Sequence, residues 1–402
     1  MEEMNRRDFI KGAGGSAFSF TIIRPESIWS TQANGKIKLG LIGCGGRGTW
    51  IANLFQEQGG FTITALADYF AEKTEAAGEK FQVPANRRYT GLQAYQRLLD
   101  GKSVDAVVIE TPPYFHPMHA EAAVQAGVHV FLAKPIAVDV PGCLTIADLG
   151  RKATAKKLCF LVDFQTRTHP FYREAIKRVQ YGEIGKIICG EATYHCGPTW
   201  DRQAEYIKKV ETTAEDRLRA WGLSRELSGD VITEQNIHTI DVATWMLDAA
   251  PVKAVGTGGQ FRKYGNCWDH FAVIYHFPNK VLVTFNSKQL GQGQDDILCR
   301  MYGSEGTIET NYFGSVSIRG NVPYKGGELV NLYKEGAQSN IADFYENIIN
   351  SKYANTTVAP SVRSNLATIL GRMAAYQHGE MTWDAMLKAG EKMEPDLKGL
   401  VL

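Results

Sequence analysis

The sequence lacks the patterns that mark several classes of protein. Its seven cysteines are scattered and form no C-x-x-C pair, so they predict neither a zinc site nor a disulfide framework, and we expect no bound metal. No apolar run of about 18 residues follows the N-terminal segment, so we expect no membrane span in the mature protein. Lysine and arginine (44) balance aspartate and glutamate (43), which gives no sign of a nucleic-acid partner.

The composition is that of a globular protein. Hydrophobic residues make up 44% of the chain and charged residues 22%, close to the usual average, so a disordered chain or a collagen-like fibre is excluded. The 402 residues suit two domains of ordinary size.

The N-terminus differs from the rest of the chain. Arg6-Arg7 is followed by Phe9-Ile10 and a weakly apolar, glycine-rich stretch at residues 12–23, which resembles a twin-arginine export signal. The alternative is a charged terminus that carries two arginines by chance. We predict that residues 1–34 are signal and linker and that the protein is periplasmic or exported to the envelope. If the signal does not function, the protein is cytoplasmic.

A strand, a glycine loop and a helix follow. Residues 36–42 are apolar enough for a buried parallel strand, and an amphipathic stretch begins near Ile51. Between them lies a G-x-G-x-x-G loop, the dinucleotide-binding fingerprint, whose helix N-terminus attracts phosphate. The cofactor-binding residues expected in it are Gly43, Cys44, Gly45, Gly46, Arg47 and Gly48.

A second strand, residues 61–67, ends in Asp68, about twenty residues past the last glycine of the loop. An acid at this place accepts hydrogen bonds from the adenosine ribose hydroxyls. No arginine follows it directly, so the sequence favours NAD over NADP.

The alternation continues with strands at residues 104–110 and 128–132 and a helix near 118–126. Ligands of open parallel sheets bind beyond the carboxyl ends of the strands, so Thr111, Pro112, His116 and Lys134 are expected near the nicotinamide. Taken alone, a lysine such as Lys134 is more often a solvated turn residue, and a loop histidine such as His116 is usually a capping or packing residue. We predict that residues 35–160 form an NAD-binding Rossmann domain.

Beyond residue 160 the pattern changes to separated strands. One more strand of the first sheet and a helix at residues 171–181 are followed by strands at residues 186–194, 252–261, 268–277, 280–288, 297–302 and 306–311. Pro278-Asn279 suits a hairpin turn, and late helices are expected at residues 341–350 and 360–376. The fold class is α/β, with residues 161–402 forming a substrate-binding and oligomerisation domain around a large, mostly antiparallel open sheet.

An acid–imidazole–acid stripe lies inside this second domain. Glu234, His238 and Asp241 stand at i, i+4 and i+7, on one face of a continuous helix. The stripe suits either a solvated face or a catalytic site. A histidine flanked by carboxylates is expected to have raised basicity, which suits a general base.

In order and spacing, the export signal, the glycine loop, Lys134-Pro135 and the Glu234–Asp241 stripe resemble the Gfo/Idh/MocA family of oxidoreductases. The resemblance covers nearly the whole chain from residue 36. It implies a Rossmann domain, a C-terminal α/β domain whose open sheet makes homodimers or homotetramers, and NAD(P)-dependent chemistry on sugars and cyclitols.

The resemblance also assigns roles. It implies that Lys134 bridges the nicotinamide ribose and the reacting hydroxyl, and that His238 takes the hydroxyl proton. Glu234 and Asp241 match the flanking acids of the family motif, and Gln165 and Arg167 fall in the substrate-lining segment. Two departures bear on substrate and turnover: Ala133 stands where the family has a glutamate, and Glu234 where an aspartate is common.

The leading hypothesis is an NAD-dependent oxidoreductase acting on a sugar, glycoside or polyol hydroxyl, with tightly bound nicotinamide and His238 as base. One alternative is a redox-neutral, NAD-dependent glycosidase or lyase that oxidises its substrate transiently. A second is a non-catalytic sugar-binding relative. Further pocket candidates, which suit a core equally well, are Tyr194, Trp200, Arg219, Trp221, Trp268 and His270.

Overall fold

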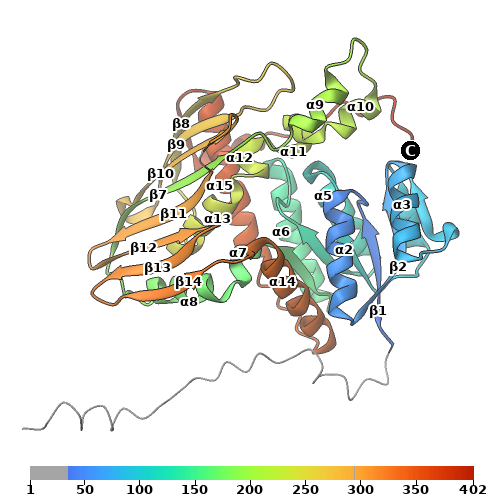
Figure 1. Ribbon diagram of the computed structural model, residues 1–402, viewed down its shortest axis with the longest axis horizontal. Helices are drawn as coiled ribbons and strands as arrows, with labels where there is room; N and C mark the ends of the chain where they lie inside the picture. The colour runs from blue at the N-terminus through green and yellow to red at the C-terminus, as the bar shows by residue number, and fades with distance from the viewer. Residues whose placement is uncertain (1–34, 294) are drawn as a thin grey trace, which may run out of the picture. The chain divides into compact units, whose positions relative to one another are not determined.

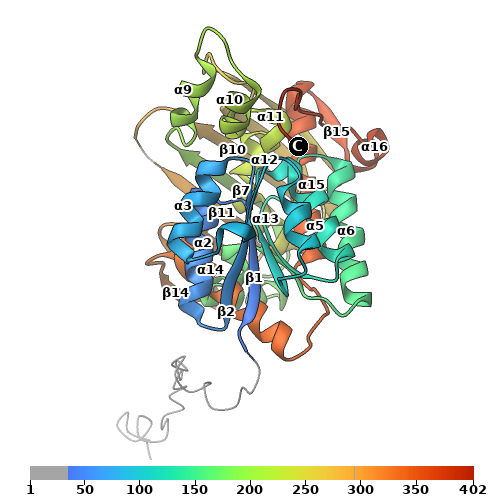
Figure 2. The same ribbon diagram turned by 90° about the vertical axis from the view of Figure 1, so that its right-hand side faces the viewer.

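The computed structural model describes residues 35–293 and 295–402, so the predicted export signal lies outside the described residues. Residues 36–402 form one unit, shown from two sides in Figures 1 and 2. None of the described helices is both long enough and apolar enough to cross a membrane.

The first sheet of the described chain is parallel throughout, with the order β3-β2-β1-β4-β5-β6. Its strands are β1 (Ile37–Ile42), β2 (Phe61–Asp68), β3 (Arg88–Thr90), β4 (Ala106–Ile109), β5 (His129–Ala133) and β6 (Phe160–Asp163). The helices between them are α2 (Gly46–Gln58), α3 (Ala71–Phe81), α4 (Ala94–Asp100), α5 (His116–Gln125) and α6 (Val140–Ala155). The strand order reverses between β1 and β4, which confirms the doubly wound fold.

The second sheet has the order β14-β13-β12-β11-β7-β10-β9-β8-β15, in which β7 and β10 are parallel and the other neighbours antiparallel. Its described strands are β7 (Ile187–Cys196), β8 (Lys253–Gly259), β9 (His270–His276), β10 (Leu282–Gln289), β11 (Asp296–Gly303), β12 (Gly306–Asn311), β13 (Ser315–Gly320), β14 (Tyr324–Glu328) and β15 (Glu380–Thr382). Buried and exposed residues alternate along β9 and β10. One face is therefore covered and the other open, as the sequence predicts.

The second half also contributes helices, some of which pack on the second sheet and some on the first half. They are α7 (Gln165–Thr168), α8 (Pro170–Gln180), α9 (Ala204–Ile207), α10 (Ala214–Arg219), α11 (Arg225–Ser228), α12 (Val231–Glu234), α13 (Ile237–Leu247), α14 (Leu332–Ile349), α15 (Val358–Tyr376) and α16 (Trp383–Ala389). Helix α15 packs on α6 and on β8, and α14 lies beside α2 (Figures 1 and 2). The α/β fold with two different sheets is therefore confirmed.

Two expectations about elements were incomplete. Helix α14 begins nine residues before the expected 341, because Asn331 caps its N-terminus by accepting the N–H of Lys334 at 3.1 Å. Strands β13 and β14 were missed. Strand β14, Tyr-Lys-Gly-Gly-Glu, has no apolar alternation, and it is held by its pairing with β13 rather than by a buried face.

An aromatic cluster fixes α14 against the first sheet. The ring of Phe344 lies 6.2 Å from that of Phe55, 6.1 Å from Phe61 and 5.6 Å from Phe131. All four side chains are fully buried.

We expect the substitution Phe344→Ala to lower the free energy of unfolding by about 3–5 kcal/mol, because it removes a buried ring and leaves a cavity. Phe261→Ala is the matched control, since Phe261 is 77% exposed, and it should change stability by no more than about 0.5 kcal/mol. Urea unfolding measures both. Equal effects of the two substitutions would contradict this packing.

Candidate active site

The glycine loop has the geometry that a dinucleotide requires. Gly43 has φ +98°, and a Cβ there would lie 2.7 Å from the backbone of Glu110. A Cβ at Gly48 would lie 1.8 Å from the carbonyl oxygen of Gly43. At Gly45 and Gly46 a Cβ would meet no atom of the protein within 4 Å. Gly43 and Gly48 are thus required by packing, whereas Gly45 and Gly46 leave space for a pyrophosphate.

Asp68 lies at the end of β2 and organises the loop. One of its carboxylate oxygens accepts the N–H of Cys44 at 2.7 Å, and the other accepts that of Phe70 at 2.9 Å. Burial raises its pKa, which these two hydrogen bonds oppose. Each oxygen keeps a second lone pair for a ribose hydroxyl.

A cavity of about 480 Å³ opens beside the loop. Of the residues predicted to bind the cofactor, it is lined by Gly43, Gly45, Gly46, Asp68, Thr111 and Pro112. The open space at the loop, the acid at the ribose position and this cavity together fit a bound dinucleotide.

His116 does not line the cavity. Its ring nitrogens lie 2.7 Å from the carbonyl oxygens of Pro135 and Thr111, so it ties together the loops that follow β4 and β5. Burial lowers its pKa to about 4. His119, which the sequence analysis did not single out, does line the cavity, and its Nδ1 lies 3.1 Å from the Thr111 hydroxyl.

The side chain of Arg47 points into the protein rather than along the phosphate loop. Its guanidinium forms ion pairs with Glu110 at 3.1 Å and Asp163 at 2.6 Å, and it donates to the Tyr333 hydroxyl. Burial raises the pKa of Glu110 to about 7, which the charge of Arg47 opposes.

These two acids flank the position of the missing family glutamate. In the sheet register, Ala133 pairs with Asp163, and Leu132 pairs with Ile109, the residue before Glu110. Strands β4 and β6 therefore supply carboxylates on both sides of Ala133. Sequence reasoning missed both, although each directly follows an apolar strand run, which was the available signal.

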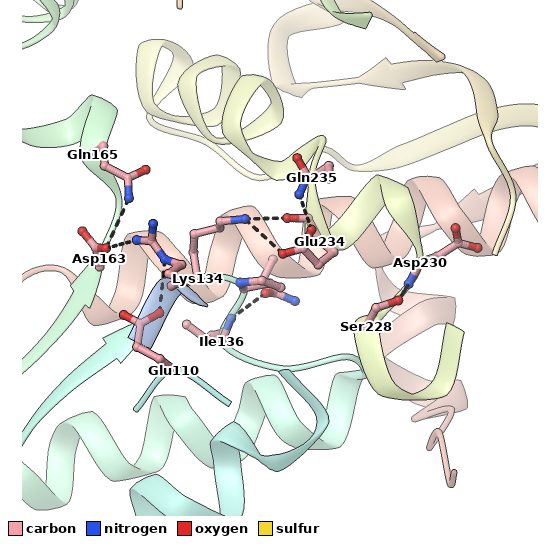
Figure 3. A network of polar contacts seen from close by, with 12 residues as sticks. Glu110, Lys134, Ile136, Asp163, Gln165, Ser228, Asp230, Glu234 and Gln235 are labelled. Atoms are coloured by element: carbon pink, nitrogen blue, oxygen red, sulfur yellow. Dashed lines mark hydrogen bonds and ion pairs between the residues drawn. The ribbon is translucent and has the colours of Figure 1, made fainter. Parts of the chain in front are cut away.

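Lys134 contacts Glu234 across 100 residues of sequence. Its ammonium donates to the Glu234 carbonyl at 2.6 Å and lies 3.4 Å from Oε1 of that side chain. Figure 3 shows Lys134 reaching toward Glu234, with Glu110 and Asp163 on its other side. Burial lowers the pKa of Lys134, which the carboxylate of Glu234 opposes.

A second contact fixes Glu234. Its Oε2 accepts the amide of Gln235 at 2.5 Å, and Gln235 in turn accepts the Tyr194 hydroxyl at 2.9 Å. Both acceptor oxygens of Glu234 are thus oriented by neighbours.

The expectation of one continuous helix through Glu234 and Asp241 was wrong. Helix α12 ends at Glu234 and α13 begins at Ile237. In a continuous helix the Glu234 carbonyl would accept the N–H of His238. Here it accepts Lys134 instead, and the His238 N–H turns to Gln235 at 3.4 Å.

The short helix α12 is positioned by Asp230. This residue has φ 74° and ψ 166°, a conformation that costs a non-glycine residue about 1–3 kcal/mol. Its buried carboxylate accepts the Val231 N–H at 2.6 Å and the Tyr376 hydroxyl at 2.5 Å. The Asp230 contacts therefore hold the start of the helix that presents Glu234.

His238 is 7% exposed, and its Nδ1 is buried without a hydrogen-bond partner among the described residues. Its ring lies 6.5 Å from that of Tyr194 and 5.6 Å from that of Tyr312. Burial, and then the charges of Lys134 and Arg47, hold its pKa well below the usual range. The expected raised basicity was therefore wrong, because burial is the largest influence on this pKa and the charges that act on it are cations.

The carboxylate of Asp241 binds Arg167 and Ser364 rather than Lys134 or His238. Arg167 forms a bidentate pair with it at 2.7–3.1 Å, and the Ser364 hydroxyl donates to it at 2.6 Å. Gln165 donates to Asp163 at 3.2 Å, and its Oε1 is buried without a partner among the described residues. The structure thus groups Lys134, Glu234 and His238, while Asp241 and Arg167 satisfy each other.

The further pocket candidates lie in different parts of the structure. Tyr194 belongs to the Lys134 cluster through Gln235, whereas Trp221 and Arg219 line the cavity. Trp200 packs on Trp221 at 4.9 Å, and Trp268 stacks on Tyr376 at 4.0 Å. The side chain of His270 lies beside Asp269 at 2.8 Å.

A dinucleotide fingerprint at the switch point of a doubly wound sheet defines a Rossmann-type dinucleotide-binding protein. Residues 37–162 match the model of the Gfo/Idh/MocA oxidoreductase family, NAD-binding Rossmann fold, and residues 172–309 match the Gfo/Idh/MocA C-terminal domain. The two matches stand in the family's order and cover about two thirds of the chain. The protein belongs to the Gfo/Idh/MocA oxidoreductase family.

Curated relatives include proteins named as glycosidases and proteins named as oxidoreductases. A glycosyl hydrolase family 109 protein of Solibacter usitatus is 31% identical over 211 residues, 48% of this chain and 47% of the relative. Inositol 2-dehydrogenase of Rhizobium meliloti is 24% identical over 345 residues, 83% of this chain and 94% of the relative. The chain thus spans about half the length of the glycosyl hydrolase relatives it matches and nearly all of the dehydrogenase.

Solved structures share the fold. An oxidoreductase from Agrobacterium radiobacter, solved with NAD⁺, L-tartaric acid and magnesium, superposes with a TM-score of 0.70. The two sequences are 16% identical, and the match covers 87% of this chain and 99% of that one.

Proposed function

We propose that the protein is an NAD-dependent oxidoreductase acting on a hydroxyl group of a sugar, glycoside or polyol. The observation that carries this proposal is the buried His238 imidazole beside the Lys134 ammonium, with no hydrogen-bond partner for its Nδ1 among the described residues. A neutral imidazole accepts a proton, and a neighbouring ammonium stabilises the negative charge left on the hydroxyl oxygen. The names of the inositol dehydrogenase relative and of its family support the same chemistry.

Each residue of the cluster has a distinct role in this proposal. Bound nicotinamide supplies the hydride acceptor for the carbon that carries the hydroxyl group. His238 accepts the hydroxyl proton, and the Lys134 ammonium stabilises the developing alkoxide. Glu234 orients that ammonium through its carbonyl and its carboxylate. Asp68 and the glycine loop hold the two ends of the adenosine diphosphate.

The lowered pKa of His238 predicts the pH dependence of the rate. The pKa of this base lies below the ordinary value of 6.5, so His238 is deprotonated and active at pH 6.5 and above. Activity is lost as the pH falls through the lowered pKa. The acid limb of kcat should therefore lie below pH 6.5. In Lys134→Met the neighbouring charge is gone, so the acid limb of the residual activity should move to higher pH. An unmoved limb would contradict the coupling between the two groups.

A second candidate is a redox-neutral, NAD-dependent glycosidase, in which oxidation of the hydroxyl is transient. Relatives named glycosyl hydrolase family 109 favour it. The same base and the same lysine serve both candidates, so the site geometry alone supports either.

Product analysis distinguishes the two candidates. The purified protein is incubated with NAD and a panel of polyols, aldoses and nitrophenyl glycosides, and the products are separated by mass. An oxidoreductase yields a keto product together with reduced nicotinamide. A glycosidase yields hydrolysed glycoside with NAD unchanged. No product from any compound, in a protein that binds NAD, would favour a sugar-binding relative and contradict the proposal.

We also propose that the cofactor stays bound between turnovers and that the protein is exported as a folded homo-oligomer. The paired arginines Arg6-Arg7 support export, and free NAD is scarce outside the cytoplasm. A captive cofactor needs recycling by a second sugar or within one turnover.

A further inference from the structure

The dinucleotide cavity is lined from two distant parts of the chain. Beyond Asp68 its wall continues along Tyr69, Phe70 and Leu92 of the first half. The opposite wall comes from the second half, where residues 201–223 contribute Tyr206, Arg219 and Trp221. Lys134 and His238 are not among the described residues that line it. The cavity therefore lies away from Lys134 and His238, and we assign it to the adenosine half of the site.

Residues 201–223, here called the lobe, lie above the first sheet. Both ribbon views place α9 and α10 over the ends of its strands (Figures 1 and 2). Thr213 forms a capping box with Asp216 at the start of α10, which gives this short helix a defined end. The lobe is thus a structured part of the second half and not an extended loop.

Direct contacts fasten the lobe to the loop after β2. The Arg219 guanidinium lies 3.8 Å from the centre of the Phe70 ring and pairs with Glu72 at 2.7 Å. The Tyr69 hydroxyl donates to Glu215 at 3.1 Å. Arg219, Phe70 and Tyr69, which make these contacts, all line the cavity.

Residues 392–402 make a second set of contacts with the same part of the first half. The N–H of Val401 donates to the Tyr69 hydroxyl at 3.2 Å, and the Val401 carbonyl accepts the N–H of Leu92 at 3.0 Å. Leu397 and Leu400 pack with the apolar cluster that contains Trp221. The lobe and residues 392–402 therefore meet on the same loops of the first sheet.

The chemistry of these walls fits adenosine. Adenine is flat and apolar on its faces, so it stacks on aromatic rings such as Trp221 and on a guanidinium such as Arg219. Lys73 and Arg202 also line the cavity, and the acids Glu110 and Glu205 balance their charge.

We propose that the lobe and residues 392–402 form a clasp over the adenosine half of the dinucleotide and slow its release. This inference rests on the proposed function only for the identity of the ligand, NAD. Trp221 and Arg219 are the residues of the clasp that contact the adenosine. Glu72 anchors the clasp without lining the cavity.

Release of the cofactor tests the clasp directly. The whole protein is loaded with NADH and chased with excess NAD, and the loss of bound-NADH fluorescence gives the dissociation rate. Trp221→Ala and Arg219→Ala should accelerate release by about 10-fold to 100-fold, the usual effect of removing a stacking partner. Glu72→Gln, which removes one exposed ion pair, should accelerate it by a few-fold.

Matched controls are Trp383→Ala in α16 and Arg319→Ala in β13, which lie outside the cavity lining. They should release NADH at the wild-type rate. Circular dichroism establishes that each variant is folded, and Glu72→Gln keeps the test valid if a larger substitution unfolds the lobe.

The outcomes separate this inference from the proposed function. Wild-type release rates in all three clasp variants would overturn the clasp and leave the oxidoreductase proposal intact. Faster release, in a protein that oxidises no sugar, would support the clasp and overturn the proposed reaction. A wild-type protein that binds neither NAD nor NADH would overturn both.

Discussion

Substitution of His238 by asparagine is expected to lower the rate of substrate oxidation by about 10²–10⁴-fold, the usual contribution of a general base. Asparagine fills much of the same space between Tyr194 and Tyr312 but accepts no proton. Affinity for NAD should stay at the wild-type value, because His238 is not among the described residues that line the adenosine cavity. Pre-steady-state reduction of nicotinamide measures the chemical step.

His378→Asn is the matched control, since His378 is exposed and bonds Thr257 on the far side of the second sheet. It should oxidise substrate at the wild-type rate. Full activity in His238→Asn would contradict the assignment of His238 as the general base. It would also contradict the catalytic role proposed for the cluster of Lys134, Glu234 and His238.

The substitutions Gly45→Ala and Gly48→Ala are expected to have different effects, the first on NAD binding and the second on stability. Gly45 has φ −68°, which any residue adopts, and its Cβ would meet no protein atom. Gly45→Ala is therefore expected to fold normally but to bind NAD about 100-fold more weakly, a loss of about 2.8 kcal/mol, because the methyl group occupies the pyrophosphate space. Gly48→Ala places its Cβ against the Gly43 carbonyl and should cost about 1–3 kcal/mol of stability.

Calorimetry of NAD binding and thermal unfolding without added ligand separate the two effects. Gly379→Ala is the control, because a Cβ there meets nothing closer than 3.6 Å, and it should leave both measurements unchanged. Normal NAD affinity in Gly45→Ala would show that the pyrophosphate does not lie on this loop.

The sequence was most informative where the signal is local. The apolar run of β1, the glycines after it and Asp68 at the end of β2 predict the first sheet and its ligand edge, because strand, turn and helix preferences act over a few residues. In the structure, Gly43 and Gly48 are both required by close backbone approaches, which the fingerprint implies.

Long-range contacts decide the features that the sequence did not predict. The break after Glu234 depends on an ammonium 100 residues away, which takes the carbonyl that a continuous helix would use. The pKa of His238 is lowered by burial and by Lys134 and Arg47, neither of which is near it in sequence. Spacing along a helix carries no information about such partners.

The clasp illustrates the same limit. Trp221 and Arg219 were candidates for a sugar pocket, yet they line the adenosine half of the cavity. Their place follows from long-range contacts that no local pattern encodes: Arg219 pairs with Glu72, and Val401 bonds Tyr69 and Leu92.

The central claim, that this chain is built around a resident nicotinamide dinucleotide, is tested most directly by denaturing the purified protein and quantifying the nicotinamide released per chain. The account predicts near-stoichiometric NAD or NADH in the wild-type protein and little in Gly45→Ala prepared in the same way. A wild-type protein that carries no dinucleotide and takes up none when NAD is added would contradict it.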